Sequence, residues 1–200
     1  KWYQRELESY PSFWGCRANL GRVLIKLKHW HQAFQELRVA LNDCPATENN
    51  ARAEIHLDKA LCLRAQAQAE AAKKELQEGL ILATEAQLKA NLSHELARIY
   101  HHQGVFELAQ HHFNQAYSFY PSTKTQWEQA RSLSDYKHYQ EAYPLFLKAA
   151  KAQNLTSTQQ GHIIGQAANC LMEINQPEKA WSLYNQALQI SKCNTLKLSQ

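Results

Sequence analysis

One short pattern occurs five times in this chain and constrains its fold more than any other feature. An alanine is followed four residues later by a large apolar residue and seven residues later by alanine or glycine, at Ala33, Ala72, Ala109, Ala142 and Ala180. These anchor alanines are 39, 37, 33 and 38 residues apart. Recurrence in this range is typical of tandem supersecondary units, each of which buries its apolar face only against its neighbours. We therefore expect one continuous array.

Each copy of the pattern is predicted to lie in the second helix of a helix pair. Upstream of two anchors, Gly21 and Ala97 place small residues where two helices can approach closely. Pro45 and Pro121 each follow an anchor alanine by twelve residues. Because proline cannot continue a helix, these two residues are expected to end the second helices.

With these features the chain resembles the tetratricopeptide repeat (TPR) family, whose 34-residue repeat has a Leu-Gly-x2-Tyr helix, an Ala-x3-Phe-x2-Ala helix and a closing proline. The first and third units match well, whereas the second has Lys59-Ala60 and the fourth Gln129-Ala130 in place of Leu-Gly. The resemblance implies an all-α, right-handed α-solenoid of tandem helix-turn-helix repeats.

The expected boundaries follow from the register of the anchors. Residues 1–12 are interpreted as the end of a preceding repeat, because Pro11 stands near the position of a closing proline. Since the chain begins at Lys1, it is expected to be a piece of a longer protein. Residues 195–200 are interpreted as a tail or the start of a further helix. Between them, residues 13–194 are expected to hold five TPR-like repeats at about 14–47, 53–86, 90–123, 123–156 and 161–194. Spacings of 37 to 39 predict helices or loops a few residues longer than the 34-residue repeat, near Thr47–Asn50, Glu85–Lys89 and Asn154–Gln159.

Charge and cysteine content exclude some classes of function. A formal net charge of +4 is too small to indicate nucleic-acid binding, so no nucleic-acid partner is expected. The five cysteines show no zinc-ligand spacing, and Cys62 and Cys170 stand ten residues before their anchors, as expected for buried thiols. Reduced thiols favour a cytoplasmic location, and no apolar run is long enough to predict a membrane span.

The resemblance implies that the first helices of successive repeats line a concave groove in which ligands bind. The position eleven residues before each anchor holds arginine three times, and neighbouring positions add basic and aromatic residues. The predicted partner-binding residues are Arg22, Lys26, Arg64, His94, Arg98, His101, Trp127 and Arg131. Guanidinium groups bind carboxylates through two hydrogen bonds and an indole anchors apolar side chains, which favours an acidic protein or peptide partner.

Two alternatives concern the same residues. In the first alternative, the arginines pair with carboxylates of their own helices, among them Glu95, Glu128, Asp58 and Asp135. The family's binding of the C-terminal carboxylate of cytosolic chaperones requires asparagine where this chain has Asp58, and lysine and arginine where it has Asn91 and Glu95, so that use is not expected.

The histidines and glycines do not predict a metal, a cofactor or an active site. Adjacent histidines such as His101 and His102, or His111 and His112, point about 100° apart on a helix and cannot chelate as a pair. The chain has no G-x-S-x-G, phosphate-binding loop or H-E-x-x-H. The sequence predicts a non-enzymatic protein-interaction module; the alternatives are a regulatory sensor array controlling an attached effector domain and a scaffold of an envelope or secretion assembly.

Overall fold

The structure is a computed structural model that describes the main chain of residues 13–197 and the side chains of residues 13–190. Those residues form ten helices, labelled α2 to α11, and no strand. The chain divides into two compact units, Lys1–Tyr120 and Pro121–Gln200, and each is described by itself. The all-α fold of tandem helix pairs predicted from the sequence is confirmed.

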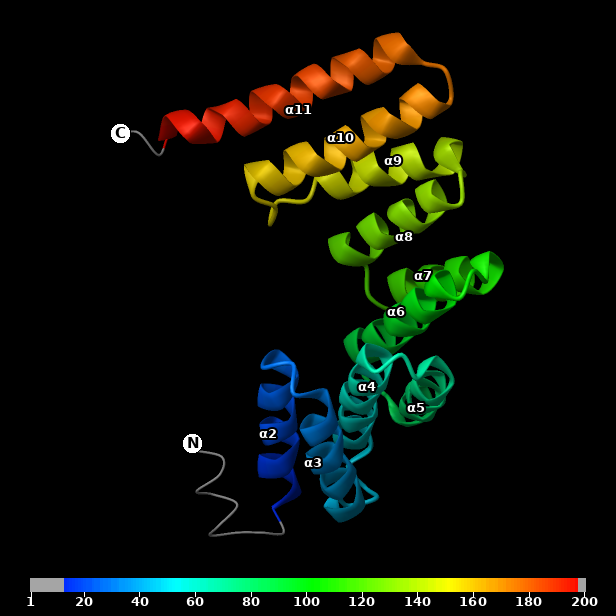
Figure 1. The fold of residues 1–200 in the computed structure, drawn as a ribbon, viewed down its shortest axis with the longest axis vertical. Helices are drawn as coiled ribbons and strands as arrows, with labels where there is room; N and C mark the ends of the chain where they lie inside the picture. Colours follow the sequence, from blue (N-terminus) through cyan, green and yellow to red (C-terminus); the bar gives the residue numbers. More distant parts are fainter. Residues whose placement is uncertain (1–12, 198–200) are drawn as a thin grey trace. The chain divides into compact units, whose positions relative to one another are not determined.

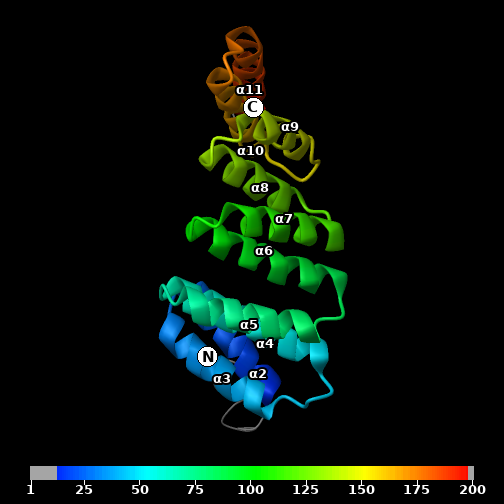
Figure 2. The same ribbon diagram turned by 90° about the vertical axis from the view of Figure 1, so that its right-hand side faces the viewer.

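The first unit contains three described helix pairs in chain order (Figures 1 and 2). The first helices contact one another, α2 with α4 and α4 with α6, so their side chains share one face of this unit. The pairs are α2 (Trp14–Lys26) with α3 (Trp30–Asp43), α4 (Asn49–Ala65) with α5 (Ala69–Leu82), and α6 (Ala86–His102) with α7 (Phe106–Phe119).

The second unit contains two described pairs. Helix α9 packs against both α8 and α10, and α10 packs against α11, as each helix follows the last in Figure 1. The pairs are α8 (Thr123–Asp135) with α9 (Tyr139–Ala150), and α10 (Ser157–Glu173) with α11 (Pro177–Lys197).

The helix bounds explain the uneven spacing of the anchors. Helices α2 and α8 have 13 residues and begin at the expected starts of the first and fourth repeats. Helices α4, α6 and α10 have 17 residues and begin four residues before the expected starts, because each carries one extra helical turn. Residues 195–197 continue α11, whereas residues 1–12 and 198–200 lie outside the described chain.

The turn between the two helices is the same in every described pair. The residue five positions before the anchor adopts a left-handed conformation, with φ of 58° to 79°, at Lys28, Ala67, Gly104, Lys137 and Asn175. In the first pair, the N–H of the next residue, His29, donates to the carbonyl of Leu24 at 2.9 Å, and the His29 carbonyl accepts from the N–H of Ala33 at 2.9 Å. This Schellman arrangement satisfies the end of one helix and starts the next.

Close packing between paired helices depends on small residues. All five anchor alanines are 0% exposed. A Cβ atom at Gly21 would lie 2.6 Å from Cγ of Leu37, which is too close for any side chain to be added without movement. At Gly79 a Cβ would lie 2.9 Å from Leu92 and 3.3 Å from the carbonyl oxygen of Ala53. The predicted close approach at these small residues is therefore present.

The second helices end near the predicted closing prolines, and side chains of the next pair satisfy their carbonyls. Helices α3 and α7 end two residues before Pro45 and Pro121. Arg52 of α4 donates from Nη1 to the carbonyls of Leu41 at 3.2 Å and Cys44 at 2.8 Å. Gln160 stands twenty residues before its anchor Ala180, as Arg52 does before Ala72. Its Nε2 donates to the carbonyl of Ala150 at 3.0 Å.

The left-handed turn generates a prediction about stability. Replacing Ala67, at φ 59°, by glycine should raise the unfolding free energy by about 1 kcal/mol, because glycine adopts this conformation without the steric cost that alanine has. The matched control is Ala71→Gly on the exposed side of α5, which should lower the unfolding free energy by about 1 kcal/mol. Urea unfolding followed by circular dichroism measures both; a shift in the same direction for both variants would contradict the turn assignment.

Candidate functional site

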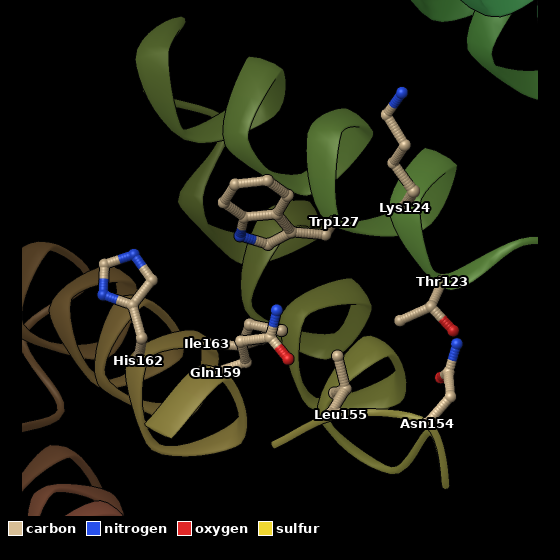
Figure 3. Close-up of a pocket in the computed structure, with 8 residues that line it drawn as sticks. All are labelled: Thr123, Lys124, Trp127, Asn154, Leu155, Gln159, His162 and Ile163. Carbon is tan, nitrogen blue, oxygen red and sulfur yellow. The ribbon is translucent and has the colours of Figure 1, made fainter. Parts of the chain in front are cut away.

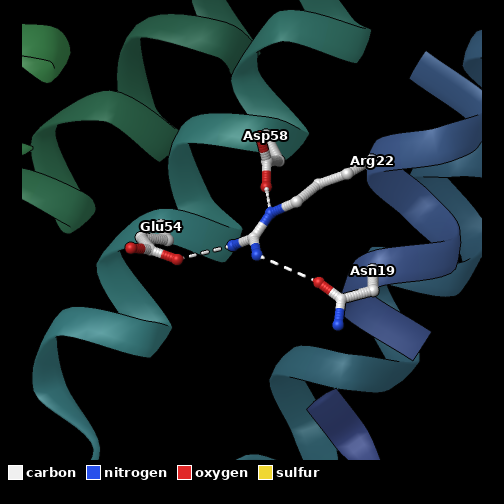
Figure 4. Close-up of polar contacts among 4 residues, drawn as sticks. All are labelled: Asn19, Arg22, Glu54 and Asp58. Carbon is white, nitrogen blue, oxygen red and sulfur yellow. Dashed lines mark hydrogen bonds and ion pairs between the residues drawn. The ribbon is translucent and has the colours of Figure 1, made fainter. Parts of the chain in front are cut away.

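The first predicted binding residue, Arg22, is held by carboxylates of the next repeat (Figure 4). Its Nε donates to Oδ2 of Asp58 at 2.8 Å and its Nη2 to Oε2 of Glu54 at 2.6 Å, both on α4. Its Nη1 donates to Asn19 of its own helix at 3.3 Å. Burial raises the pKa of Asp58 despite the opposing effect of Arg22. The guanidinium thus connects α2 to α4.

Arg64 and Arg98 both meet one buried carboxylate. Glu95 of α6 is 7% exposed; its Oε2 lies 3.3 Å from Nε of Arg64 on α4, and its Oε1 accepts from Nη1 of Arg98 at 3.1 Å. Of the four described ion pairs that Arg22, Arg64 and Arg98 make, only that of Arg98 with Glu95 lies within one helix, as the pairing alternative expects, and the other three join neighbouring first helices. The shared face of α2, α4 and α6 carries alternating charge.

The other predicted residues of the first unit lie in different surroundings. His94 is only 4% exposed, and its ring packs edge-on against Phe113 of α7 with centroids 5.8 Å apart. It therefore lies between the paired helices, away from the surface on which the sequence analysis placed it. Lys26 is exposed, and His101 is half-buried with its ring centroid 5.2 Å from that of His102.

In the second unit the structure brings Trp127 and Arg131 together. Both lie on α8, and the Arg131 guanidinium carbon is 5.8 Å from the centroid of the Trp127 indole. The indole Nε1 donates to Oε1 of Gln166 on α10 at 2.6 Å. Because one hydrogen bond and one cation–π contact fix its orientation, the indole presents a defined apolar surface.

Trp127 lines an open hollow of about 440 Å³ between α8 and α10. Figure 3 shows the indole facing Gln159 and Ile163 of α10, with Asn154 and Leu155 of the loop before α10 near Thr123 at the start of α8. The apolar wall comes from Trp127, Leu155 and Ile163. The lining residues are Thr123, Lys124, Trp127, Asn154, Leu155, Gln159, His162 and Ile163.

A capping box fixes the orientation of Gln159. The hydroxyl of Thr156 accepts from the N–H of Gln159 at 3.2 Å, and Oε1 of Gln159 accepts from the N–H of Thr156 at 2.9 Å. Since Oε1 is engaged by the helix cap, the Nε2 of Gln159 is the end that points into the hollow toward Trp127 (Figure 3). Together with Lys124 and His162, it makes the polar lining rich in donors, and none of the eight lining residues is acidic.

Sequence analysis found Trp127 but missed the rest of this hollow. Leu155 and Asn154 lie in a loop whose path no periodicity predicts, and Lys124 lies three residues before Trp127 on the same face of α8. The only available signal was the longer spacing before Ala180, which marked the region near Asn154–Gln159.

Solved structures match the chain over most of its length. A Podosopora anserina protein described as a kinesin light chain with nearly identical TPR-like repeats is 19% identical and superposes with a TM-score of 0.74, covering 93% of this chain and 98% of that one. BtubC (BKLC) from P. vanneervenii is 14% identical, with a TM-score of 0.80 and coverage of 96% and 87%. The chain has the tetratricopeptide-repeat fold.

Another similar structure is that of YrrB, a TPR protein with an unusual peptide-binding site. It is 15% identical and superposes with a TM-score of 0.68, covering 100% of this chain and 97% of that one. No protein-family model and no curated protein matches the sequence. Among the described residues, none of the TPR helices is both long enough and apolar enough to cross a membrane.

The second TPR repeat contains a buried polar network that sequence analysis did not find. Nδ1 of His56 lies 2.7 Å from Oε2 of Glu75 and 3.6 Å from Oε2 of Glu78, while Nζ of Lys59 lies 2.7 Å from the other oxygen of Glu75. It is the one cluster of metal-ligand side chains among the described residues. The Lys59 ammonium already neutralises Glu75, so the arrangement needs no ion to satisfy its charges.

The described thiols are all buried. Cys16, Cys44, Cys62 and Cys170 are between 0% and 3% exposed. Burial raises the pKa of Cys62 to about 12, and burial also raises the pKa of Cys170, whose Sγ lies 3.7 Å from Oγ of Ser134. Such thiols are protonated at neutral pH and pack as small apolar groups, which is the role predicted for Cys62 and Cys170.

The network around Glu75 predicts a pH dependence of stability. Burial alone would raise the pKa of Glu75, but hydrogen bonds from His56 and Lys59 outweigh it and lower the pKa below its ordinary value of 4.5. A lowered folded-state pKa stabilises the fold above the unfolded pKa, and this contribution is lost as the pH falls through the folded pKa. Glu75→Gln should therefore cost about 1–3 kcal/mol at pH 7 and almost nothing near pH 3.

Urea unfolding between pH 3 and pH 7 measures the difference between wild type and variant. The control is Glu78→Gln, whose side chain is 46% exposed and lies farther from His56; it should change stability much less at every pH. An equal loss for Glu75→Gln at pH 3 and pH 7 would show that the charge of Glu75 is not what stabilises the network.

Proposed function

We propose that the chain is a non-enzymatic protein-interaction module that binds a carboxylate-bearing peptide segment in the hollow between α8 and α10. The observation that carries the proposal is the combination, in one hollow, of an oriented indole, an aliphatic wall and a donor-rich lining without acidic residues. Small specific sites combine apolar surface with a few placed polar groups in this way.

The chemistry of the lining selects the kind of peptide. An apolar side chain of the partner would pack on Trp127, Leu155 and Ile163, and a carboxylate beside it would accept from the amide of Gln159. The Lys124 ammonium points away from Gln159 (Figure 3), so it would attract the acidic residue from the rim of the hollow. An Asp or Glu next to a large apolar residue fits both requirements. Charge-assisted hydrogen bonds to a carboxylate are stronger than neutral ones, so the acidic residue would contribute to specificity as well as affinity.

The arginines of the first unit are a weaker choice for the acidic partner. Arg22, Arg64 and Arg98 already meet carboxylates of this chain at 2.6 to 3.3 Å, so a ligand carboxylate would have to displace an internal one. The fold also supports the proposal by analogy, because YrrB, which shares it, is a TPR protein with a peptide-binding site.

The test is a selection from a random peptide library displayed on phage, with the 200-residue chain as the target. Selected peptides should be enriched for an acidic residue next to a large apolar one. Trp127→Ala should weaken their binding at least tenfold, because the indole forms the apolar wall. Lys124→Glu should weaken it three- to tenfold and remove most of its dependence on salt.

Two controls separate the hollow from the rest of the surface. Lys74→Glu changes an exposed lysine of α5 and should leave affinity unchanged, and circular dichroism should show unchanged helix content in every variant. Selected peptides that bind Trp127→Ala as tightly as the wild type would place the binding site elsewhere and sink the proposal.

A further inference from the structure

Arg131 lacks the internal counterion that the other arginines of its column have. The position eleven residues before the anchor holds three arginines, Arg22, Arg98 and Arg131. Arg22 meets carboxylates of this chain at 2.6 and 2.8 Å, and Arg98 meets one at 3.1 Å. The Arg131 guanidinium forms no ion pair or hydrogen bond with any described residue, and it contacts the ring of Trp127 instead.

The first unit shows which groups occupy the equivalent place (Figure 4). The partners of Arg22 on α4 are Glu54 and Asp58, which stand eighteen and fourteen residues before the anchor of their repeat. On α10, the same two positions hold His162 and Gln166. Neither residue carries a carboxylate, so α10 does not supply the negative charge that α4 supplies to the arginine of the preceding repeat.

The side chains beside Arg131 are arranged to donate hydrogen bonds. Oε1 of Gln166 accepts from the indole of Trp127 at 2.6 Å, which leaves the amide nitrogen of Gln166 as its other polar end. The guanidinium carbon of Arg131 lies 5.8 Å from the centroid of the same indole. A planar guanidinium over an aromatic ring still presents N–H groups at its edge, and these bind a carboxylate through two hydrogen bonds.

The acidic residues of α8 and α10 do not neutralise Arg131. Glu128 and Asp135 stand three residues before and four residues after it on α8, which is the spacing of helical ion pairs, yet neither forms an ion pair with it. The one acidic residue of α10 is Glu173, two helical turns beyond Gln166 at the end of the helix. The acceptor that Arg131 lacks can therefore come from a bound partner.

We propose that Arg131 is a specificity-determining residue of the hollow and binds a second carboxylate of the peptide. This carboxylate takes the place that Glu54 and Asp58 have beside Arg22. The inference rests on the proposed function, in which the first carboxylate accepts from Gln159, and it adds a second acidic residue to the partner. A peptide with one acidic residue leaves the half-buried guanidinium without an acceptor, so affinity distinguishes the two kinds of peptide.

The helix geometry sets the distance between the two acidic residues. Gln159 precedes Gln166, the neighbour of Arg131 at the indole, by seven residues on α10, which corresponds to about 10 Å along the helix. An extended peptide advances about 3.3 Å per residue. The partner segment therefore carries two acidic residues about three positions apart, with the apolar residue for Trp127 between them.

Selection from a random phage-displayed peptide library, on the wild-type chain and on Arg131→Gln in parallel, tests this inference. Wild-type peptides should carry an acidic residue next to a large apolar one and a second acidic residue about three positions from the first. Selection on Arg131→Gln should keep the acidic–apolar pair and lose the second acidic residue. The pair alone in the wild-type selection would overturn the role of Arg131 but not the proposed function, whereas absence of the pair would overturn both.

A double-mutant cycle measures the contact directly. One two-acid peptide from the wild-type selection is synthesised with a fluorescein label and an amidated C-terminus, together with a version in which the second acidic residue is replaced by its amide. In anisotropy titrations, Arg131→Gln should weaken binding of the two-acid peptide about tenfold and that of the amide version less than about twofold. Arg38→Gln, which removes an exposed arginine of α3, is the matched control and should leave both affinities unchanged.

Equal losses for the two peptides would overturn the proposal, because Arg131 would then act through the orientation of Trp127 or through net charge. Circular dichroism should show the same helix content in wild type, Arg131→Gln and Arg38→Gln, which excludes unfolding as the cause of a loss in affinity.

Discussion

The hydrogen-bonded turn that joins each left-handed residue to its anchor alanine is the constraint on which the rest of the structure depends. It ends the first helix, starts the second and fixes the angle between them within six residues. The anchor then lies fully buried at the contact of the two helices, where a larger side chain would not fit. Because every pair has the same turn, the first helix of the next repeat packs on an equivalent surface, and repeats can follow one another along the chain.

The sequence predicted the helix pairs because their determinants are local. Anchor alanines, close-packed glycines such as Gly21 and the closing prolines each impose geometry by themselves. The left-handed conformation has a sequence signal at Gly104 and a weaker one at Asn175, whereas Ala67 and Lys137 carry no signal for a positive φ. Tertiary structure imposes that conformation there. The extra turn in α4, α6 and α10 was visible as a longer spacing near the starts of these helices, but the spacing did not decide between a longer helix and a longer loop.

The candidate site was less predictable because its contacts join residues far apart in the sequence. Helical register placed Arg22 and Arg98 on the first helices, but it contained no information on the distance between α2 and α4. That distance brings Glu54 and Asp58 to Arg22 across more than thirty residues. His94 was assigned to the surface from its column, yet its ring packs against Phe113 of α7 and is buried. Trp127 was found because an aromatic residue stands out on a polar helix, whereas its neighbours Leu155 and Asn154 come from a loop.

The buried thiols allow local unfolding of the native chain to be measured repeat by repeat. A thiol-modifying reagent reacts with the thiolate, and Cys16, Cys62 and Cys170 lie in three different repeats behind helix contacts that must separate before reaction. Once Cys193, whose side chain lies outside the described residues, is replaced, the rate at which each remaining cysteine reacts would report how often its repeat opens. Because each repeat is stabilised by contacts with its neighbours, comparing those rates would show which repeat separates from its neighbours most readily.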